Sequence, residues 1–162
     1  MSKHADKKTN AMRELERAGQ PYIPHWFECP EALSGTEVAH MLGEDPDCVF
    51  KTLVTVGKSG EHYVFMIPVA MELDLKKAAA VVGEKHVAMV KSKELLGLTG
   101  YVHGGCSPLG MKKFFTTTID ESAELYDTIF FSGGRIGCQI QTSLASLEAT
   151  IPLTKADITT LA

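Results

Sequence analysis

Apolar side chains recur along this chain at two different spacings, and these predict alternating helices and strands. In residues 7–18 they recur every three to four positions, the spacing of a helix with one buried face. In residues 49–56 and 62–67 they fill two short runs on either side of a turn sequence at residues 57–60. Such a pair of runs predicts a β-hairpin.

Cap residues bound two of the predicted helices. Ser34 and Glu37 form a capping-box pattern that opens a short helix, and Gly43 closes it. Asp74 opens a second helix over residues 75–82, again followed by glycine. The same reasoning predicts further helices at residues 92–96 and 143–149, and strands at residues 22–27, 86–90, 114–119, 128–131 and 136–141.

Hairpins mixed with crossing helices indicate the α+β class. We expect a mixed, mostly antiparallel, barrel-like sheet with helices packed around it. The 162 residues, 44% of them apolar, fit a single domain over residues 1–162. No apolar run approaches the length that spans a bilayer, and the polar start has no apolar signal core, so we expect a cytoplasmic protein without a membrane partner.

A lysine lies inside one apolar strand. Side chains alternate between the faces of a strand, so Lys51 shares a face with Val49 and Leu53. Both faces of residues 49–54 are largely apolar, which predicts that Lys51 is not a freely solvated charge. A cation held beside apolar surface needs a carboxylate, backbone carbonyls or a ligand as its partner.

A glycine-rich loop at residues 104–110 offers backbone N–H groups at close range. Gly105 and Gly110 have the spacing of a P-loop, but Met111 follows where that motif requires lysine, which argues against nucleotide hydrolysis. The loop can present N–H groups to an anion or to a polarised carbonyl. A purely structural turn, with glycines that adopt positive φ, explains the same residues.

The cysteines are widely spaced and form no CxxC pair, which argues against a zinc site or a dithiol redox site. Cys48 and Cys138 are expected to be buried small hydrophobes. Cys106 follows His103 by three residues, so a thiol nucleophile with its base is an alternative to be tested, although no third, orienting residue is evident.

The charge is unevenly distributed along the chain. The net charge is −4, yet residues 76–113 contain seven lysines and two acidic residues. This positive middle section could steer a phosphate-bearing ligand, or it could be a solvated lysine-rich surface.

Four motifs that follow one another in order resemble the YbaK/EbsC family of aminoacyl-tRNA deacylases, the freestanding relatives of the prolyl-tRNA synthetase editing domain. They are Phe50-Lys51-Thr52-Leu53, the Leu73–Ala79 segment, the Gly104–Gly110 loop with Lys112-Lys113, and Ser132-Gly133-Gly134-Arg135-Ile136-Gly137. The resemblance covers nearly the whole chain and is strongest to the Cys-tRNA(Pro) deacylase branch, with Cys-tRNA(Cys) as a related substrate.

The resemblance implies the fold of that family and hydrolysis of the ester that joins a mischarged amino acid to the 3′ end of tRNA. It implies Lys51 as the catalytic residue, assisted by the substrate's own thiol, and no metal or other cofactor. The implied partners are a tRNA acceptor end and prolyl-tRNA synthetase. The implied substrate-binding residues are Phe27, Thr52, Gly104, Gly105, Cys106, Ser107, Pro108, Gly110 and Gly134.

Two departures from the family pattern bear on specificity. Phe27 stands where the cysteine branch often has tyrosine, and residues 145–150 lack the Pro-x-Asp-Leu of many relatives. Deacylation of another small aminoacyl-tRNA, such as Ala-tRNA(Pro), is therefore an alternative. A second alternative is a non-catalytic module that binds tRNA or a synthetase.

Overall fold

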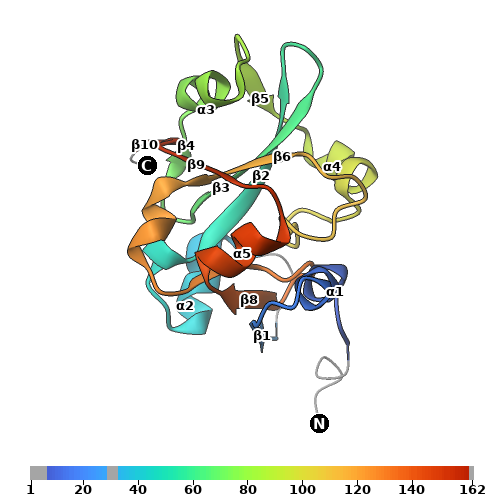
Figure 1. The fold of residues 1–162 in the computed structure, drawn as a ribbon, viewed down its shortest axis with the longest axis vertical. Coiled ribbons are helices and arrows are strands. Elements are labelled where there is room, and N and C mark those ends of the chain that lie inside the picture. Colours follow the sequence, from blue (N-terminus) through green and yellow to red (C-terminus); the bar gives the residue numbers. More distant parts are fainter. Residues whose placement is uncertain (1–6, 29–32, 161–162) are drawn as a thin grey trace.

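The computed structural model describes residues 7–28 and 33–160, and these contain short helices interleaved with strands (Figure 1). The helices are α1 (Asn10–Arg17), α2 (Gly35–Leu42), α3 (Leu75–Val82), α4 (Ser92–Thr99), α5 (Leu144–Thr150) and the 3₁₀ turns η1 (Pro46–Cys48) and η2 (Glu121–Leu125). The strands are β1 (Ile23–Trp26), β2 (Phe50–Gly57), β3 (His62–Pro68), β4 (Glu72–Leu73), β5 (Val87–Met89), β6 (Thr116–Asp120), β7 (Ile129–Ser132), β8 (Cys138–Thr142), β9 (Thr154–Ala156) and β10 (Thr159–Thr160).

A five-stranded mixed sheet with the order β5-β2-β3-β6-β9 forms the centre of the molecule. The predicted hairpin β2–β3 is antiparallel, as is β2–β5, whereas β6 pairs in parallel with both β3 and β9. The mixed α+β class and the predominance of antiparallel pairs are confirmed.

The strands do not close into a barrel, so the predicted barrel-like sheet requires correction. A second sheet has the order β1-β8-β7, and β4 and β10 form a separate pair. The central and second sheets meet through one isolated parallel bridge, Val49–Phe130. A barrel would need continuous pairing around its wall, and a single bridge leaves the two sheets distinct.

Local capping chemistry fixes the helix ends that the sequence predicted. Ser34 and Glu37 form the complete capping box of α2, and Gly43 closes that helix in the left-handed conformation. Asp74 accepts hydrogen bonds from two N–H groups of the first turn of α3. Helix α4 continues to Thr99, beyond the predicted residue 96, and the short strands β4, β9 and β10 were not predicted.

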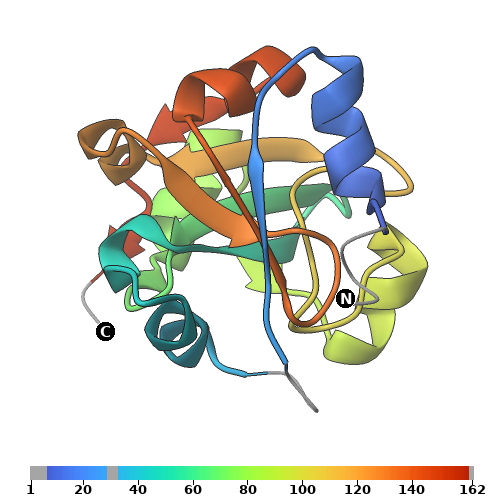
Figure 2. The same cartoon turned by 90° about the horizontal axis from the view of Figure 1, so that it is seen from below.

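Apolar side chains cover both faces of the central sheet. One face joins α1, α5 and the second sheet in a core that contains Phe50, Met66 and Ile140. The other face carries Phe65 and Ile67 beneath α3. Figure 2 shows α1 and α5 along one side of the sheets, with α2 and α4 apart from each other on the opposite side. No helix in the described residues is long and apolar enough to cross a membrane.

Candidate active site around strand β2

Strand β2 has an edge that is only partly covered. One side of β2 pairs with β3 along its length, whereas β5 covers the other side only from Thr55 to Gly57. Hydrogen bonds of Val49 and Gly57 to the β3 side fix the alternation of this antiparallel pair. By that alternation, the N–H and C=O groups of Thr52 point toward the uncovered edge.

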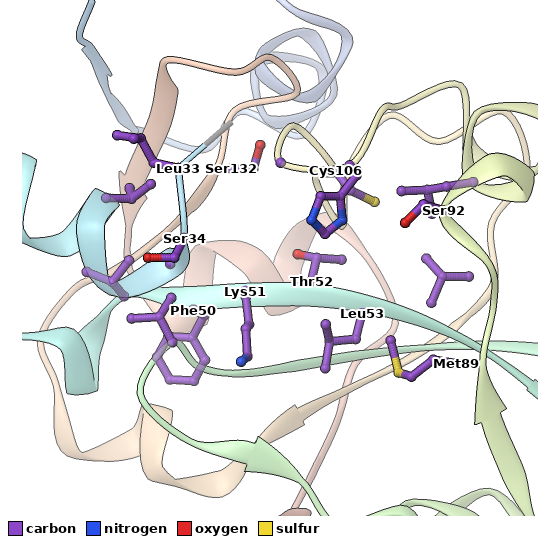
Figure 3. A pocket seen from close by; sticks show the side chains of 18 of the residues that line it. Leu33, Ser34, Phe50, Lys51, Thr52, Leu53, Met89, Ser92, Cys106 and Ser132 are labelled. Carbon is purple, nitrogen blue, oxygen red and sulfur yellow. The ribbon is translucent and has the colours of Figure 1, made fainter. Parts of the chain in front are cut away.

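A cavity of about 500 Å³ lies along this edge. Its walls are the N-terminal end of α2, the segment from β5 into α4, the loop that contains His103 and Cys106, and the strands β7 and β8 (Figure 3). The volume is in the range of sites that bind small molecules or the end of a larger ligand.

The two faces of β2 bring different chemistry to the cavity. In Figure 3 the side chain of Thr52 points toward Cys106, and the side chain of Lys51 leaves the strand on the other side. Lys51 is half-buried, and burial lowers the pKa of its ammonium group, while the negative charge of Glu72 partly opposes this shift. Lys51 is therefore a cation under desolvation, as the sequence predicted, at the wall of a cavity.

Two buried polar atoms of the cavity wall have no hydrogen-bond partner within the described part of the chain. They are Thr52 Oγ1 and Gln139 Oε1, and Gln139 is only 8% exposed. Ser132 also lines the cavity, and its hydroxyl accepts a hydrogen bond from the N–H of Gly134. Because buried acceptors are normally paired, a ligand that donates hydrogen bonds would complete this side of the cavity.

The glycine-rich loop contributes only part of its length to the cavity wall. Gly104 and Cys106 line the cavity. Among residues 7–28 and 33–160, neither N–H group donates a hydrogen bond to another backbone group.

The remainder of the loop holds the wall in place. The N–H of Gly110 donates to Glu14 Oε2 at 2.9 Å, and a Cβ at this glycine would lie 2.8 Å from the carbonyl carbon of Asn10 in α1. The Ser107 hydroxyl is buried and accepts a hydrogen bond from the N–H of Leu109. Gly110 and Ser107 thus connect the loop to α1 and to itself.

Four more of the predicted substrate-binding residues lie outside the cavity lining. Gly105 is buried against the backbone of Arg135 and Ile136, and Pro108 is also buried. Gly134 has φ +99° and lies beside the ring of Tyr101. Phe27 follows β1 and donates its N–H to the carbonyl of Gly137. The structure therefore brings Lys51, Thr52, Gly104 and Cys106 together at the cavity, and not the rest of the predicted set.

The geometry disfavours Cys106 as a nucleophile. Cys106 is 8% exposed, and burial raises the pKa of its thiol to about 12, so the thiol is protonated near neutral pH. Cys48 and Cys138 are buried free thiols, as predicted. The fourth cysteine, Cys29, lies outside the described residues.

Ser132 and Gln139 are cavity residues that the sequence analysis missed. Each lies at the ladder between β7 and β8, where Ser132 is opposite Gln139. Residues 132–137 entered the sequence analysis only as a family motif. The available signal was the register of the hairpin that follows from the predicted strands on either side, which places Ser132 opposite Gln139.

Comparisons with known proteins identify the family of this chain. The sequence model of the aminoacyl-tRNA editing domain family matches residues 29–150. A protein of Enterococcus faecalis (strain ATCC 700802 / V583), named "Putative Cys-tRNA(Pro)/Cys-tRNA(Cys) deacylase EbsC", is 45% identical over 162 residues, which cover 98% of this chain and 97% of the relative.

Two crystal structures share the fold. One, of a hypothetical protein, has a TM-score of 0.85 at 20% identity and covers 94% of this chain and 100% of its own. The other, of "a putative trans-editing enzyme for prolyl tRNA synthetase", has a TM-score of 0.80 at 24% identity and covers 95% of this chain and 99% of its own. The family resemblance predicted from the motifs around Lys51 is confirmed, and this chain belongs to the aminoacyl-tRNA editing domain family.

Proposed function

We propose that this protein removes cysteine from mischarged Cys-tRNA(Pro), and that Cys-tRNA(Cys) is a further substrate. The observation that carries the proposal is a cavity with a desolvated lysine and a protonated thiol, in a chain closely similar to a protein named as a deacylase of these substrates. The cavity offers charge and hydrogen-bond donors, and its cysteine is in the wrong protonation state to attack an ester.

Lys51 has the properties of the catalytic residue. It forms no hydrogen bond or ion pair within the described ranges, so its ammonium group is free to interact with an oxygen of the substrate. Desolvation strengthens such an interaction because the local dielectric constant is low. From its side of β2 the Lys51 ammonium group holds an oxygen of the 3′-terminal nucleotide, while the N–H groups of Gly104 and Cys106, on the Thr52 side, stabilise the oxyanion that develops on the ester carbonyl.

The substrate supplies the nucleophile. The cysteine thiol attacks its own carbonyl carbon, so a sulfur–carbon bond forms while the ester carbon–oxygen bond breaks. The thiol proton passes to the departing ribose oxygen, and the tRNA leaves with an intact 3′ end. Water then opens the cyclic thioester. The protein's contribution is positioning and electrostatic stabilisation.

Prolyl-tRNA synthetase is the proposed source of the mischarged tRNA. The cavity is small and can exclude bulky side chains, but a hydrophobic pocket discriminates poorly between amino acids of similar size. Selection of the tRNA therefore rests on contacts outside the cavity or on a complex with the synthetase.

The test is amino-acid release from Cys-tRNA(Pro) and from Ala-tRNA(Pro), with wild type, Lys51→Ala and the exposed-lysine control Lys76→Ala. We expect release of cysteine by wild type and by the control, and loss of this release in Lys51→Ala. Release of alanine alone would change the assigned substrate from Cys-tRNA(Pro) to Ala-tRNA(Pro), and it would contradict attack by the substrate thiol. Release of neither would overturn the proposal.

A further inference from the structure

Four exposed lysines lie at the two ends of α4. Lys91 is the N-cap of this helix and Lys93 lies in its first turn. Lys112 and Lys113 lie beside the last turn, because the N–H of Lys112 donates to the carbonyl of Thr99 at 3.0 Å. We call these four residues the α4 rim.

The α4 rim is free of charge partners. None of its lysines takes part in an ion pair within the described ranges, whereas Lys8, Lys77 and Lys155 are all paired. The one acidic residue of α4, Glu94, accepts a hydrogen bond from the backbone N–H of Lys91. Against the single negative charge of Glu94, the four rim lysines leave a local net charge of +3 that faces solvent.

The α4 rim borders the mouth of the cavity. Ser92 and Leu95 of α4 are part of the cavity lining, and the loop from α4 to Lys112 contains the wall residues His103 and Gly104. A ligand that extends out of the cavity on this side must pass over α4. In Figure 3, Ser92 and Met89 mark this side, and Leu33 and Ser34 mark the opposite one.

The two sides of the cavity mouth carry opposite charge. Residues 91–113, on the α4 side, contain four lysines and one glutamate. Residues 33–47, which include α2, contain four acidic residues and no lysine or arginine. A polyanion is attracted to one side and repelled from the other, so the charge pattern gives it a direction of approach.

Exposed apolar groups accompany the lysines. Leu96 on the outer face of α4 is 53% exposed, and Phe114, next to Lys113, is 48% exposed. An aromatic ring beside lysines is the combination that binds single-stranded nucleic acid, where the ring stacks on a base and the cations contact phosphates.

We propose that the α4 rim binds the phosphates of the tRNA acceptor end and so directs the 3′ terminus into the cavity. This inference rests on the proposed function, because that function places the 3′-terminal nucleotide in the cavity. The nucleotides that precede it then leave over α4 and not over the acidic α2 side. Each phosphate contact releases a counterion, so binding through the rim depends steeply on salt.

The experiment compares two variants of equal net charge. In the rim variant Lys91, Lys93, Lys112 and Lys113 become glutamine, which keeps much of each aliphatic stem. In the control the same change is made at Lys7, Lys58, Lys76 and Lys85, which are exposed and lie outside α4 and its flanking residues. Affinity for uncharged tRNA is measured by fluorescence anisotropy over a range of salt concentrations, so the readout does not depend on catalysis.

We expect the rim variant to bind tRNA at least roughly tenfold more weakly at 0.1 M salt, with a salt slope shallower by about one for each lysine removed. The control should remain within about twofold of wild type. Equal losses in both variants, or none in either, would overturn the inference. Unchanged tRNA affinity with lost affinity for prolyl-tRNA synthetase would also overturn it and assign the surface to a protein partner.

A short substrate separates this inference from the proposed function. The cysteine ester of adenosine has no upstream phosphates, so the rim variant should cleave it at the wild-type rate while its kcat/KM for Cys-tRNA(Pro) falls. Rim-dependent tRNA binding without deacylation by wild type would overturn the proposed function and leave the α4 rim as an RNA-binding surface.

Discussion

The two faces of β2 contrast within a single cavity. On one face, Lys51 supplies a positive charge that burial destabilises and Glu72 partly compensates. On the other, Thr52 presents a neutral hydroxyl that, like the amide oxygen of Gln139 in β8, lacks a partner in the described chain. Adjacent positions of a strand thus divide the work between charge and hydrogen bonding, because alternation sends neighbouring side chains to opposite sides. This division indicates a site that positions and polarises a substrate instead of attacking it.

The largest effect on activity is expected from removal of the Lys51 charge. Lys51→Met keeps the apolar stem and removes the ammonium group, and it should lower kcat/KM for Cys-tRNA(Pro) by roughly 100- to 1,000-fold. The free energy of unfolding should not fall, because a desolvated cation is removed. Single-turnover deacylation and thermal unfolding measure the two effects, and wild-type activity in Lys51→Met would remove the charged face from the mechanism.

The second-largest effect, on stability, is expected in the glycine-rich loop, which lies on the Thr52 side of β2. Gly110 has φ +75°, and an added Cβ would lie 2.6 Å from the Tyr101 hydroxyl oxygen and 2.8 Å from the backbone of α1. Gly110→Ala should therefore lower the free energy of unfolding by about 2 to 3 kcal/mol, measured by urea denaturation.

A matched control for that loop is Gly97→Ala. Gly97 lies in α4, where an added Cβ meets no atom within 4 Å, so alanine should be neutral or stabilising. Equal stability of the two variants would mean that the contact between the loop and α1 does not support the cavity wall.

The third effect tests the unpartnered acceptors directly. Gln139→Leu and Thr52→Val should each lower kcat/KM by about tenfold, since each removes one hydrogen bond to the substrate. Neither should destabilise the fold, because an unsatisfied buried polar atom is lost.

Thr118→Val is the control for these two variants. The Thr118 hydroxyl is buried without a partner in the described chain as well, but Thr118 does not line the cavity. It should show the same stability and full activity, and a loss of activity equal to that of Thr52→Val would assign the effect to packing.

The pH dependence of activity and of stability tests whether the Lys51 charge is required. The pKa of Lys51 is lowered from 10.5 by burial, so its charge is lost at a lower pH than that of a solvated lysine. Catalysis that requires the charge should decline by about twofold when the pH reaches that pKa and further above it, and the decline should be absent from the residual activity of Lys51→Met. The unfolded chain holds this proton more tightly, so wild-type stability relative to Lys51→Met should rise over the same pH window.

The smallest effect is expected at Cys106. Cys106→Ser should change kcat/KM by less than about threefold, because a thiol with a pKa of about 12 is not the nucleophile. It should cost about 1 kcal/mol of stability, since a more polar hydroxyl replaces a buried thiol. Cys138→Ser is the control, as that thiol is fully buried in the core away from the cavity. If Cys106→Ser abolished turnover and Cys138→Ser did not, Cys106 would be the enzyme nucleophile.

Features that depend on neighbouring residues were predictable from the sequence. The caps at Ser34 and Asp74 and the hairpin β2–β3 follow from local chemistry, and they appear where predicted. Strands β4, β9 and β10 escaped prediction because each is two or three residues long and is defined by pairing with a distant segment.

The candidate site shows the same limit. Lys51 was recognisable because a cation in an apolar strand is unusual, and the structure places it at a cavity. Gln139 was not, because its importance arises from burial beside β7 without a partner for its amide oxygen. In the loop, a glycine that lines the cavity and a glycine that packs against α1 have the same sequence signature, and only the packing around Gly104 and Gly110 distinguishes them.

The uncovered edge of β2 has a consequence for how this protein avoids self-association. An exposed strand edge usually invites pairing with another chain, which is a route to aggregation. Here the open stretch runs only from Phe50 to Leu53, and α2, α4 and the glycine-rich loop wall it in. So short and enclosed a stretch offers a second strand few backbone groups to pair with, and this protects the edge from pairing with another chain.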